Sequence, residues 1–208
     1  MFNTRSGTVT GGSELSQRGL SLLNRYKGMK KLFDEIPLIE GECIILRKIM
    51  DKDADALDDM IHSDIVYHYE PTYLFERQFT DVHEMIRNLY GECFEKKQNL
   101  FLGIVFKEED QFCGISEIYD YRPKLHMASI GYRLRKAYWN NGIATEAAKM
   151  MADYLFNQTD VEIITASTMI ENRASAHVLE KNGFTMTSKG YPEDWGHKNP
   201  TMADRWFL

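Results

Sequence analysis

The most informative stretch of the sequence is IGYRL at residues 130–134, followed shortly by YWNNGIATEA at residues 138–147. It is typical of a β-strand, a tight turn with small residues, and the start of an α-helix. The first helical turn leaves backbone N–H groups without intrahelical acceptors, and the helix dipole adds positive potential there. Because Gly142 and Ala144 carry little bulk, an anion can approach these donors, and Thr145 can add a hydroxyl. The stretch therefore predicts a pyrophosphate site.

Two other phosphate-binding motifs are excluded. The turn contains no lysine, so it is not the GxxxxGK[ST] loop of nucleotide-hydrolysing proteins, and it does not match the dinucleotide GxGxxG pattern. A nucleotide-dependent phosphotransferase also needs a Mg²⁺ carboxylate pattern that this sequence lacks, so that class ranks far behind.

The stretch resembles the acetyl-coenzyme A motif of the GCN5-related N-acetyltransferases (GNAT), whose general form is [Gln/Arg]-x-x-Gly-x-[Gly/Ala]. Trp139 stands at the Gln/Arg position, a departure that resembles the ribosomal-protein N-terminal acetyltransferase (RimJ/RimL)-like branch. Downstream, NRASAHVLEKNGF at residues 172–184 resembles the same family's Asn-x-x-Ser segment that ends in Gly-Phe. The resemblance is specific over residues 130–184, looser over 42–129 and absent before about residue 36.

The resemblance implies how acetyl-CoA, the cosubstrate, would be held. Its pantetheine arm would pair with backbone groups on the exposed edge of a splayed strand, and its pyrophosphate would rest on the N–H groups of residues 140–145. The expected cofactor-binding residues are Tyr132, Leu134, Trp139, Asn140, Asn141, Gly142, Ile143, Ala144, Thr145 and Asn172. Asn172 is equally typical of a helix N-cap, and the two roles are compatible.

The resemblance also implies a catalytic acid. Many family members protonate the departing thiolate with a tyrosine seven positions after the motif asparagine, and this chain has Leu179 there. Ser175 occupies the position used by the ribosomal-protein branch, and its hydroxyl can donate a proton directly or through water. The alternative is that Ser175 is a first-turn helix residue with a local backbone bond.

Glu117 is the candidate base. It lies in GISE at residues 114–117, on a strand expected next to the cofactor strand, and could take the amine proton, for example through water. It could equally be an outward, solvated strand residue. His126 and His177 are weaker candidates, and a fraction of the amine can bind already neutral without any base.

Composition bounds the class of protein. The chain has 208 residues, 43% of them hydrophobic and 27% charged, as expected of one soluble globular domain. A net charge of -6 without a basic run argues against a nucleic-acid partner. The three cysteines form no CxxC or Cys/His pattern, so neither a disulfide scaffold nor a metal site is expected. Without a signal peptide or membrane-spanning run, we expect a cytoplasmic protein that does not contact membranes.

The order of elements predicts a mixed α+β or α/β chain. The GNAT-type acyl-CoA N-acyltransferase fold that the resemblance implies is a twisted central mixed sheet flanked by helices and splayed near residues 130–135. We expect an N-terminal extension over residues 1–36, partly helical, with Leu15 and Leu22 on one stripe, and the acetyltransferase domain over 37–208. Strands are expected at 42–49, 100–107, 112–119, 127–135, 161–169, 184–189 and 205–208, and helices from about 51, 80, 142 and 172.

The function implied is N-acetyltransferase activity, which moves the acetyl group from acetyl-CoA to a primary amine. The resemblance implies that the segment 51–73, rich in aspartates and tyrosines, shapes the acceptor site. For most of these aspartates we instead expect a role in capping and solubilising a surface helix, with Asp51 or Asp53 as its cap. The branch resemblance favours a protein N-terminal α-amine; an amino acid, a polyamine or an amine antibiotic stays open. The alternative is a non-catalytic acetyl-CoA-binding or sensing module. Monomer and homodimer are comparable expectations.

Overall fold

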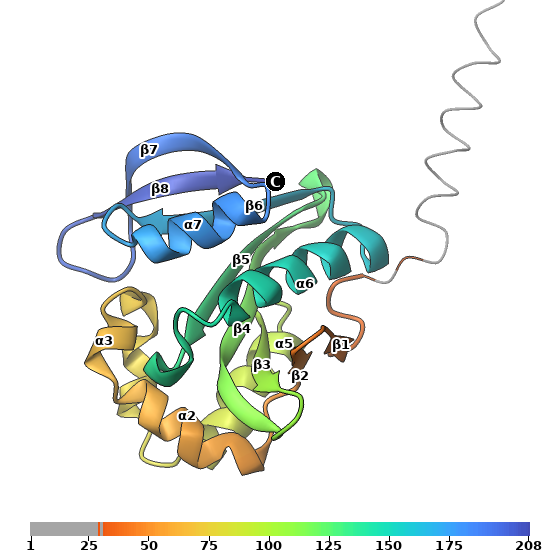
Figure 1. Cartoon of the computed structure of the whole chain (residues 1–208), viewed down its shortest axis with the longest axis vertical. Helices are drawn as coiled ribbons and strands as arrows, with labels where there is room; N and C mark the ends of the chain where they lie inside the picture. The colour runs from red at the N-terminus through yellow and green to blue at the C-terminus, as the bar shows by residue number, and fades with distance from the viewer. Residues whose placement is uncertain (1–28, 30) are drawn as a thin grey trace, which may run out of the picture.

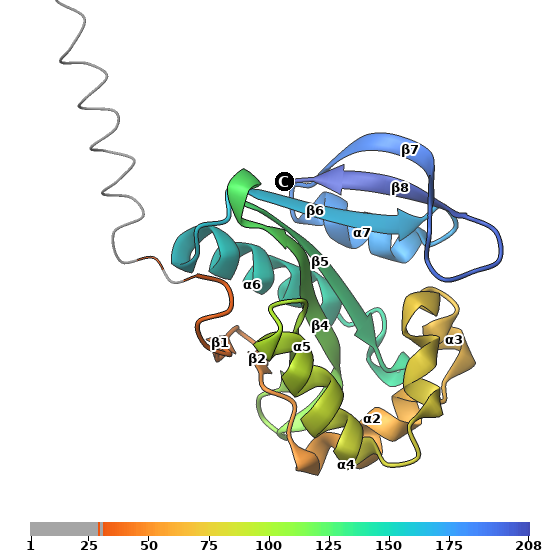
Figure 2. The same cartoon turned by 180° about the vertical axis from the view of Figure 1, so that it is seen from behind.

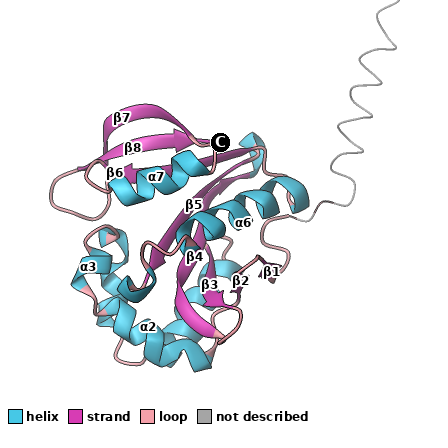
Figure 3. Ribbon diagram, in the orientation of Figure 1, coloured by secondary structure: helices cyan, strands magenta, loops and turns pink. Residues whose placement is uncertain are grey.

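Eight β-strands form one twisted mixed sheet in the order β1-β2-β3-β4-β5-β6-β8-β7 (Figures 1 and 3). This computed structural model describes residue 29 and residues 31–208, so the helical pattern expected around Leu15 and Leu22 lies outside the described residues. β5 and β6 run parallel, whereas the other neighbouring strands run antiparallel. The mixed sheet flanked by helices confirms the predicted fold class.

The strands have the following bounds: β1 Ile39–Glu40, β2 Ile44–Arg47, β3 Leu100–Phe106, β4 Gln111–Arg122, β5 Met127–Leu134, β6 Ile163–Met169, β7 Thr185–Glu193 and β8 Thr201–Phe207. The α-helices are α2 Ala54–Ile61, α3 Asp64–Tyr67, α4 Val82–Met85, α5 Gly91–Glu95, α6 Ile143–Gln158 and α7 Arg173–Lys181. Short 3-10 turns are η1 Asp51–Asp53, η2 Pro71–Gln78, η4 Pro123–Leu125 and η5 Lys136–Tyr138, and η3, Ile86–Tyr90, is a π-helix.

Helices cover both faces of the sheet. α6 and α7 lie on one face, and α2, α4 and α5 lie on the other (Figures 1 and 2). Side chains alternate along each strand, so β5 sends Ile130 and Leu134 into the core shared with α6, while Arg133 lies on the opposite face. The core that the sheet shares with α6 also contains Leu32 and Phe33. Buried residues therefore already occur before residue 37, where the acetyltransferase domain was expected to begin.

β5 and β6 diverge after a short pairing. They pair only from Met127 opposite Ile163 to Ser129 opposite Thr165. Beyond Ser129, no strand in the described part of the chain pairs with this edge of β5. Hydrogen-bonded pairs alternate in an antiparallel ladder, and the Arg135 N–H donates to the Cys113 carbonyl at 2.8 Å. Tyr132 and Leu134 therefore direct their backbone groups away from β4, toward the open edge, and the predicted splay is confirmed.

Three of the elements that differ from the sequence predictions bear on how the chain was interpreted. The helix predicted from residue 80 is interrupted, because η3 inserts a π turn between α4 and α5. The strand predicted at 184–189 continues to Glu193, and the last strand begins at Thr201. The hairpin absorbs Gly190 through register shifts, and the Asp204 carboxylate accepts the Gly190 N–H at 2.9 Å. Local turn residues in the sequence therefore concealed the length of this hairpin.

Candidate active site

The turn before α6 exposes backbone donors at the open end of the splay. Asn140 (φ 63°) and Gly142 (φ 80°) both have left-handed backbone conformations, which Asn tolerates and Gly adopts freely. No atom lies within 4 Å of where a Gly142 Cβ would stand, so the surface beside the turn is open. The first helical hydrogen bond runs from the Glu146 N–H to the Gly142 carbonyl at 3.0 Å. The N–H groups of residues 143–145 therefore have no intrahelical acceptor.

Two side chains hold this turn in place. The Trp139 indole N–H donates to the Leu134 carbonyl at 2.9 Å, which fastens the turn to the end of β5. The Glu146 Oε1 accepts the Cys43 N–H at 2.8 Å, which joins the first turn of α6 to the start of β2. Helical spacing gave no indication of this second contact, because it depends on the packing of β2 against α6.

Ser175 lies at the start of α7, and Tyr132 reaches it from β5. The Tyr132 phenol oxygen and the Ser175 Oγ are 2.9 Å apart. Burial raises the pKa of the Tyr132 phenol well above its usual value, so it stays protonated at neutral pH. Asn172 is the N-cap of α7, as its N-cap interpretation predicts, and its side chain accepts the Ser175 N–H at 3.1 Å. The family resemblance implied a role in the site for the Tyr132 backbone, but nothing in the sequence indicated that its phenol would contact Ser175.

The structure gives less support to the other positions considered for acid–base chemistry. Leu179, at the position of the family tyrosine, is buried in the core. The His177 side chain is exposed and lies 3.5 Å from Glu180 on the same helix. The Nδ1 of His126 lies 2.8 Å from the Asp160 carbonyl, at the closed end of the splay.

Glu117 lies on the opposite face of the sheet and is only 5% exposed, so the solvated outward interpretation is wrong. A Cβ on Gly131 would lie 2.5 Å from the Glu117 Oε1, which shows that this carboxylate occupies the space above the glycine. The Tyr73 hydroxyl donates to the Glu117 Oε2, and the Asn99 side-chain amide donates to the Tyr73 oxygen at 3.3 Å. Oε1 is therefore the oxygen of Glu117 nearest the cofactor strand. A glycine inside a strand was the sequence signal for this close approach.

Glu117 shares its cavity with a second carboxyl group, Glu70. Burial raises the pKa of Glu117, although Arg133 and Tyr73 oppose the shift. Burial and the charge of Glu117 raise the pKa of Glu70 to about 8. The charge of an ionised Glu117 therefore helps Glu70 to keep its proton at neutral pH.

The cavity around this pair has a volume of about 700 Å³. It lies between β5 and the C-terminal strands, and acidic and aromatic side chains line much of it. From the predicted acceptor segment 51–73, Glu70, Thr72 and Tyr73 reach it, whereas the aspartates of that segment do not. Its acidic and aromatic residues are Glu70, Glu117, Asp120, Glu193, Asp194, Tyr73, Tyr119, Trp195, Trp206 and Phe207.

Several other carboxylates of the acceptor segment pair with arginines, among them Asp53, Asp59 and Asp64. Asp53 stands at the N-cap of α2 but makes no capping hydrogen bond. Its carboxylate instead accepts from both guanidinium nitrogens of Arg47, at 2.7 and 2.9 Å. The Asp53 Oδ2 also accepts the Met50 N–H at 2.8 Å, so Asp53 caps η1, the turn that leads into α2.

A buried ion pair supports the floor of the cavity. The Arg133 Nη2 lies 2.7 Å from the Glu76 Oε1, and the Tyr67 and Tyr90 hydroxyls also donate to Glu76. The Arg133 guanidinium stacks 4.3 Å from the centre of the Tyr73 ring. This network ties η2, which carries Tyr73, to β5. It could not be predicted from the sequence, since nothing in the spacing of Glu76 and Arg133 indicates their contact.

The chain belongs to the GNAT acetyltransferase family, because the family model described as "Acetyltransferase (GNAT) domain" matches residues 44–185. It is an acetyl-CoA-dependent N-acetyltransferase by membership of that family. The predicted family and class of enzyme are confirmed.

Relatives and solved structures agree with this assignment. The chain is 27% identical over 168 residues to the N-acetyltransferase YoaA of Bacillus subtilis, covering 81% of this chain and 93% of YoaA. It resembles RimL, a ribosomal L7/L12 α-N-protein acetyltransferase solved with coenzyme A, at TM-score 0.68 and 15% identity, covering 83% and 97%. It also resembles the Vibrio cholerae spermidine N-acetyltransferase solved with CoA and spermine, at TM-score 0.66 and 15% identity, covering 81% and 96%.

Two further findings, on membrane-spanning helices and on metal-binding groups, apply to the described residues alone. None of their helices combines the length and the apolar character that crossing a bilayer demands. Nor do they contain a group of three or more histidine, cysteine or acidic side chains placed to hold a metal ion.

Proposed function

We propose that this enzyme transfers the acetyl group of acetyl-CoA directly to a primary amine, with a protein or peptide N-terminal α-amine as the favoured acceptor. One observation carries the proposal. The open edge of β5 has the α6 turn and Ser175 on one face of the sheet and the Glu117 cavity on the other. A thioester held at that edge would meet an amine arriving from the acidic cavity.

The residues around the open edge of β5 fit coenzyme A. The backbone groups of Tyr132 and Leu134 face the open edge and would pair with the pantetheine amides. The N–H groups of residues 140–145, beside an open surface at Gly142, would hold the pyrophosphate. When bound, acetyl-CoA supplies an activated acyl thioester.

The two catalytic groups act from opposite faces. The Glu117 Oε1 accepts the proton that the amine must lose, and Tyr73 holds the other oxygen in place. The Ser175 hydroxyl donates toward the sulfur as it takes up negative charge. Asn172 orients the first turn of α7, on which Ser175 lies.

The acidic cavity favours a positively charged acceptor before it loses its proton. The pKa of an α-amine is lower than that of a lysine-type amine, so a larger fraction of it is uncharged at physiological pH. It therefore depends less on a base to remove its proton. A free amino acid is disfavoured, because both cavity arginines already have acidic partners: Arg122 lies 2.7 Å from Asp120 and Arg205 lies 2.6 Å from Glu193.

A screen of acceptors tests the proposal. The purified protein is mixed with acetyl-CoA and a panel of peptides, amino acids, polyamines and aminoglycosides, and free thiol is measured. Release that depends on peptides with a free N-terminus supports the proposal. Tight acetyl-CoA binding without thiol release on any amine would favour the non-catalytic binding module instead.

A further inference from the structure

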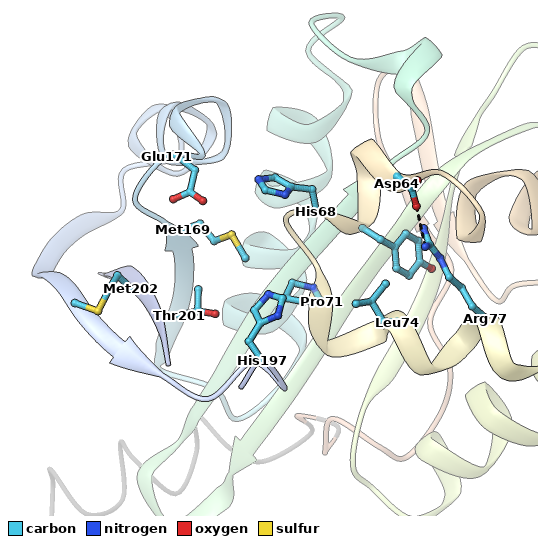
Figure 4. A pocket seen from close by; sticks show the side chains of 11 residues that line it. Asp64, His68, Pro71, Leu74, Arg77, Met169, Glu171, His197, Thr201 and Met202 are labelled. Carbon is cyan, nitrogen blue, oxygen red and sulfur yellow. Dashed lines mark hydrogen bonds and ion pairs between the residues drawn. The ribbon is translucent and has the colours of Figure 1, made fainter. Parts of the chain in front are cut away.

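A second cavity lies at the open end of the splay and takes no part in the reaction described above. Its volume is about 530 Å³. α3 and η2 form one wall, and the end of β6, the β7–β8 loop and the start of β8 form the other (Figure 4). Its lining residues are Asp64, Tyr67, His68, Pro71, Leu74, Arg77, Met169, Glu171, His197, Thr201 and Met202.

Both walls of this cavity include apolar side chains. Leu74 and Met202 lie on opposite sides in Figure 4, and they are 39% and 46% exposed. The cation in the wall, Arg77, is already engaged by the Asp64 carboxylate at 2.9 Å and the Ile61 carbonyl at 2.7 Å. Methionine side chains adapt to different apolar shapes, so this surface suits an apolar group without demanding one outline.

The cavity adjoins the one that holds Glu117. Pro71 lines the outer cavity, and the next residue, Thr72, lines the inner one. On the facing loop, His197 lines the outer cavity and Trp195 the inner one. One contact, from the Thr72 hydroxyl to the Trp195 carbonyl at 3.5 Å, bridges the walls between them. Successive groups of one extended ligand can therefore lie on the two sides of this contact.

We propose that the outer cavity is a second acceptor subsite, which binds the apolar side chain of the second residue of a peptide whose α-amine lies at Glu117. The inference rests on the proposed function and narrows its acceptor. A free amino acid and an amino-acid amide have no group to fill this subsite. A linear polyamine would place a charged or weakly apolar segment against Leu74 and Met202, a poor match for those side chains.

The test compares three acceptors that share one α-amine: alaninamide, Ala-Gly-Gly amide and Ala-Leu-Gly amide. We expect the specificity constant kcat/KM to be about tenfold or more higher for the leucine peptide than for the glycine peptide, as apolar pockets typically discriminate. Leu74→Gln should bring that ratio close to one. Leu125→Gln is the matched control, because Leu125 is an exposed leucine in the β4–β5 turn and lines neither cavity.

The outcomes separate the subsite from the reaction. If the glycine and leucine peptides react equally well, or if Leu74→Gln keeps the leucine preference, the subsite is wrong although the proposed function stands. A linear triamine that outcompetes every peptide would overturn the proposed subsite as well. If no amine reacts, the proposed function fails, and methyl NMR of the CoA-bound protein decides the subsite. Shifts of the Met169 and Met202 methyls on adding Ala-Leu-Gly amide support it, and unchanged methyls overturn it.

Discussion

The Tyr132 phenol and the Ser175 hydroxyl lie 2.9 Å apart across the open side of β5, and they join the cofactor strand to the first turn of α7. Because the buried phenol keeps its proton, it can donate to the Ser175 oxygen. The serine hydrogen is then free to point elsewhere, toward the position we assign to the thioester sulfur. Tyr132 would thus act through Ser175 as a positioning residue.

Ser175→Ala should lower kcat about 100-fold, as expected for loss of a proton donor, while the Kd for acetyl-CoA stays nearly unchanged. Tyr132→Phe should lower kcat less, about tenfold, because the serine hydroxyl remains but loses its orientation. The double variant should be no slower than Ser175→Ala alone, since groups that act as a unit are not additive. Steady-state kinetics over a range of pH, with CoA titrations, measure these effects. Multiplicative losses, or a Ser175→Ala enzyme as fast as wild type at every pH, would contradict the assignment.

Glu117→Gln should lower kcat/KM by about 100-fold or more and remove the carboxyl inflection from its pH profile, because the amide cannot accept a proton. The Tyr73 hydroxyl can still donate to the amide oxygen, so the fold should hold. Acetyl-CoA affinity, measured by calorimetry, is the control and should not change. A variant that keeps both the rate and the pH profile of the wild type would show that the amine needs no base from this side chain.

The raised pKa of Glu70 makes the stability of the fold depend on pH. The pKa of Glu70, about 8, lies above that of an unfolded glutamate, so the folded state binds protons more tightly than the unfolded chain. The wild type should therefore lose stability as the pH rises from the unfolded pKa of a glutamate, about 4.3, to about 8, and Glu70→Gln should lose less over this range. Thermal unfolding at a series of pH values measures the difference.

Glu76→Gln should destabilise the fold by about 3 kcal/mol, because it leaves the buried Arg133 charge without its partner. Glu76 is only 1% exposed and holds two tyrosine hydroxyls besides the guanidinium. Asp153→Asn is the matched control, since Asp153 pairs with Lys149 on the exposed side of α6 and should cost about 0.5 kcal/mol or less. Urea denaturation measures both, and equal costs would contradict the role given to the buried pair.

The sequence predicts those parts of the site that depend on local backbone geometry. Gly142 and the small residues after it specify a helix start with free donors, and Asn172 specifies the cap of α7, because both signals act within a few residues. The splay of β5 followed from the family resemblance, and the pairing of only three residues with β6 agrees with it.

Contacts between distant elements could not be predicted in this way. Tyr132 meets Ser175, and Glu117 lies above Gly131, only because the sheet brings β4, β5 and α7 together. The length of the β7–β8 hairpin was concealed by Gly190, whose N–H is satisfied by a side chain of the neighbouring strand. Hydrophobic periodicity carries no information on such pairings, because it reports which face of an element is buried and not what covers it.

If the backbone donors before α6 hold the diphosphate of coenzyme A, a side chain at Gly142 should weaken CoA binding, and calorimetric titration of CoA into Gly142→Val measures this effect. Gly196→Val is the matched control, because Gly196 (φ 83°) has the same left-handed backbone and the same open surroundings as Gly142 (φ 80°). We predict that Gly142→Val weakens CoA binding by about 30-fold or more, as its side chain and strained backbone displace the donors, and that Gly196→Val binds like wild type. Equal affinities for all three proteins, with both variants folded, would show that the backbone donors before α6 do not hold the diphosphate.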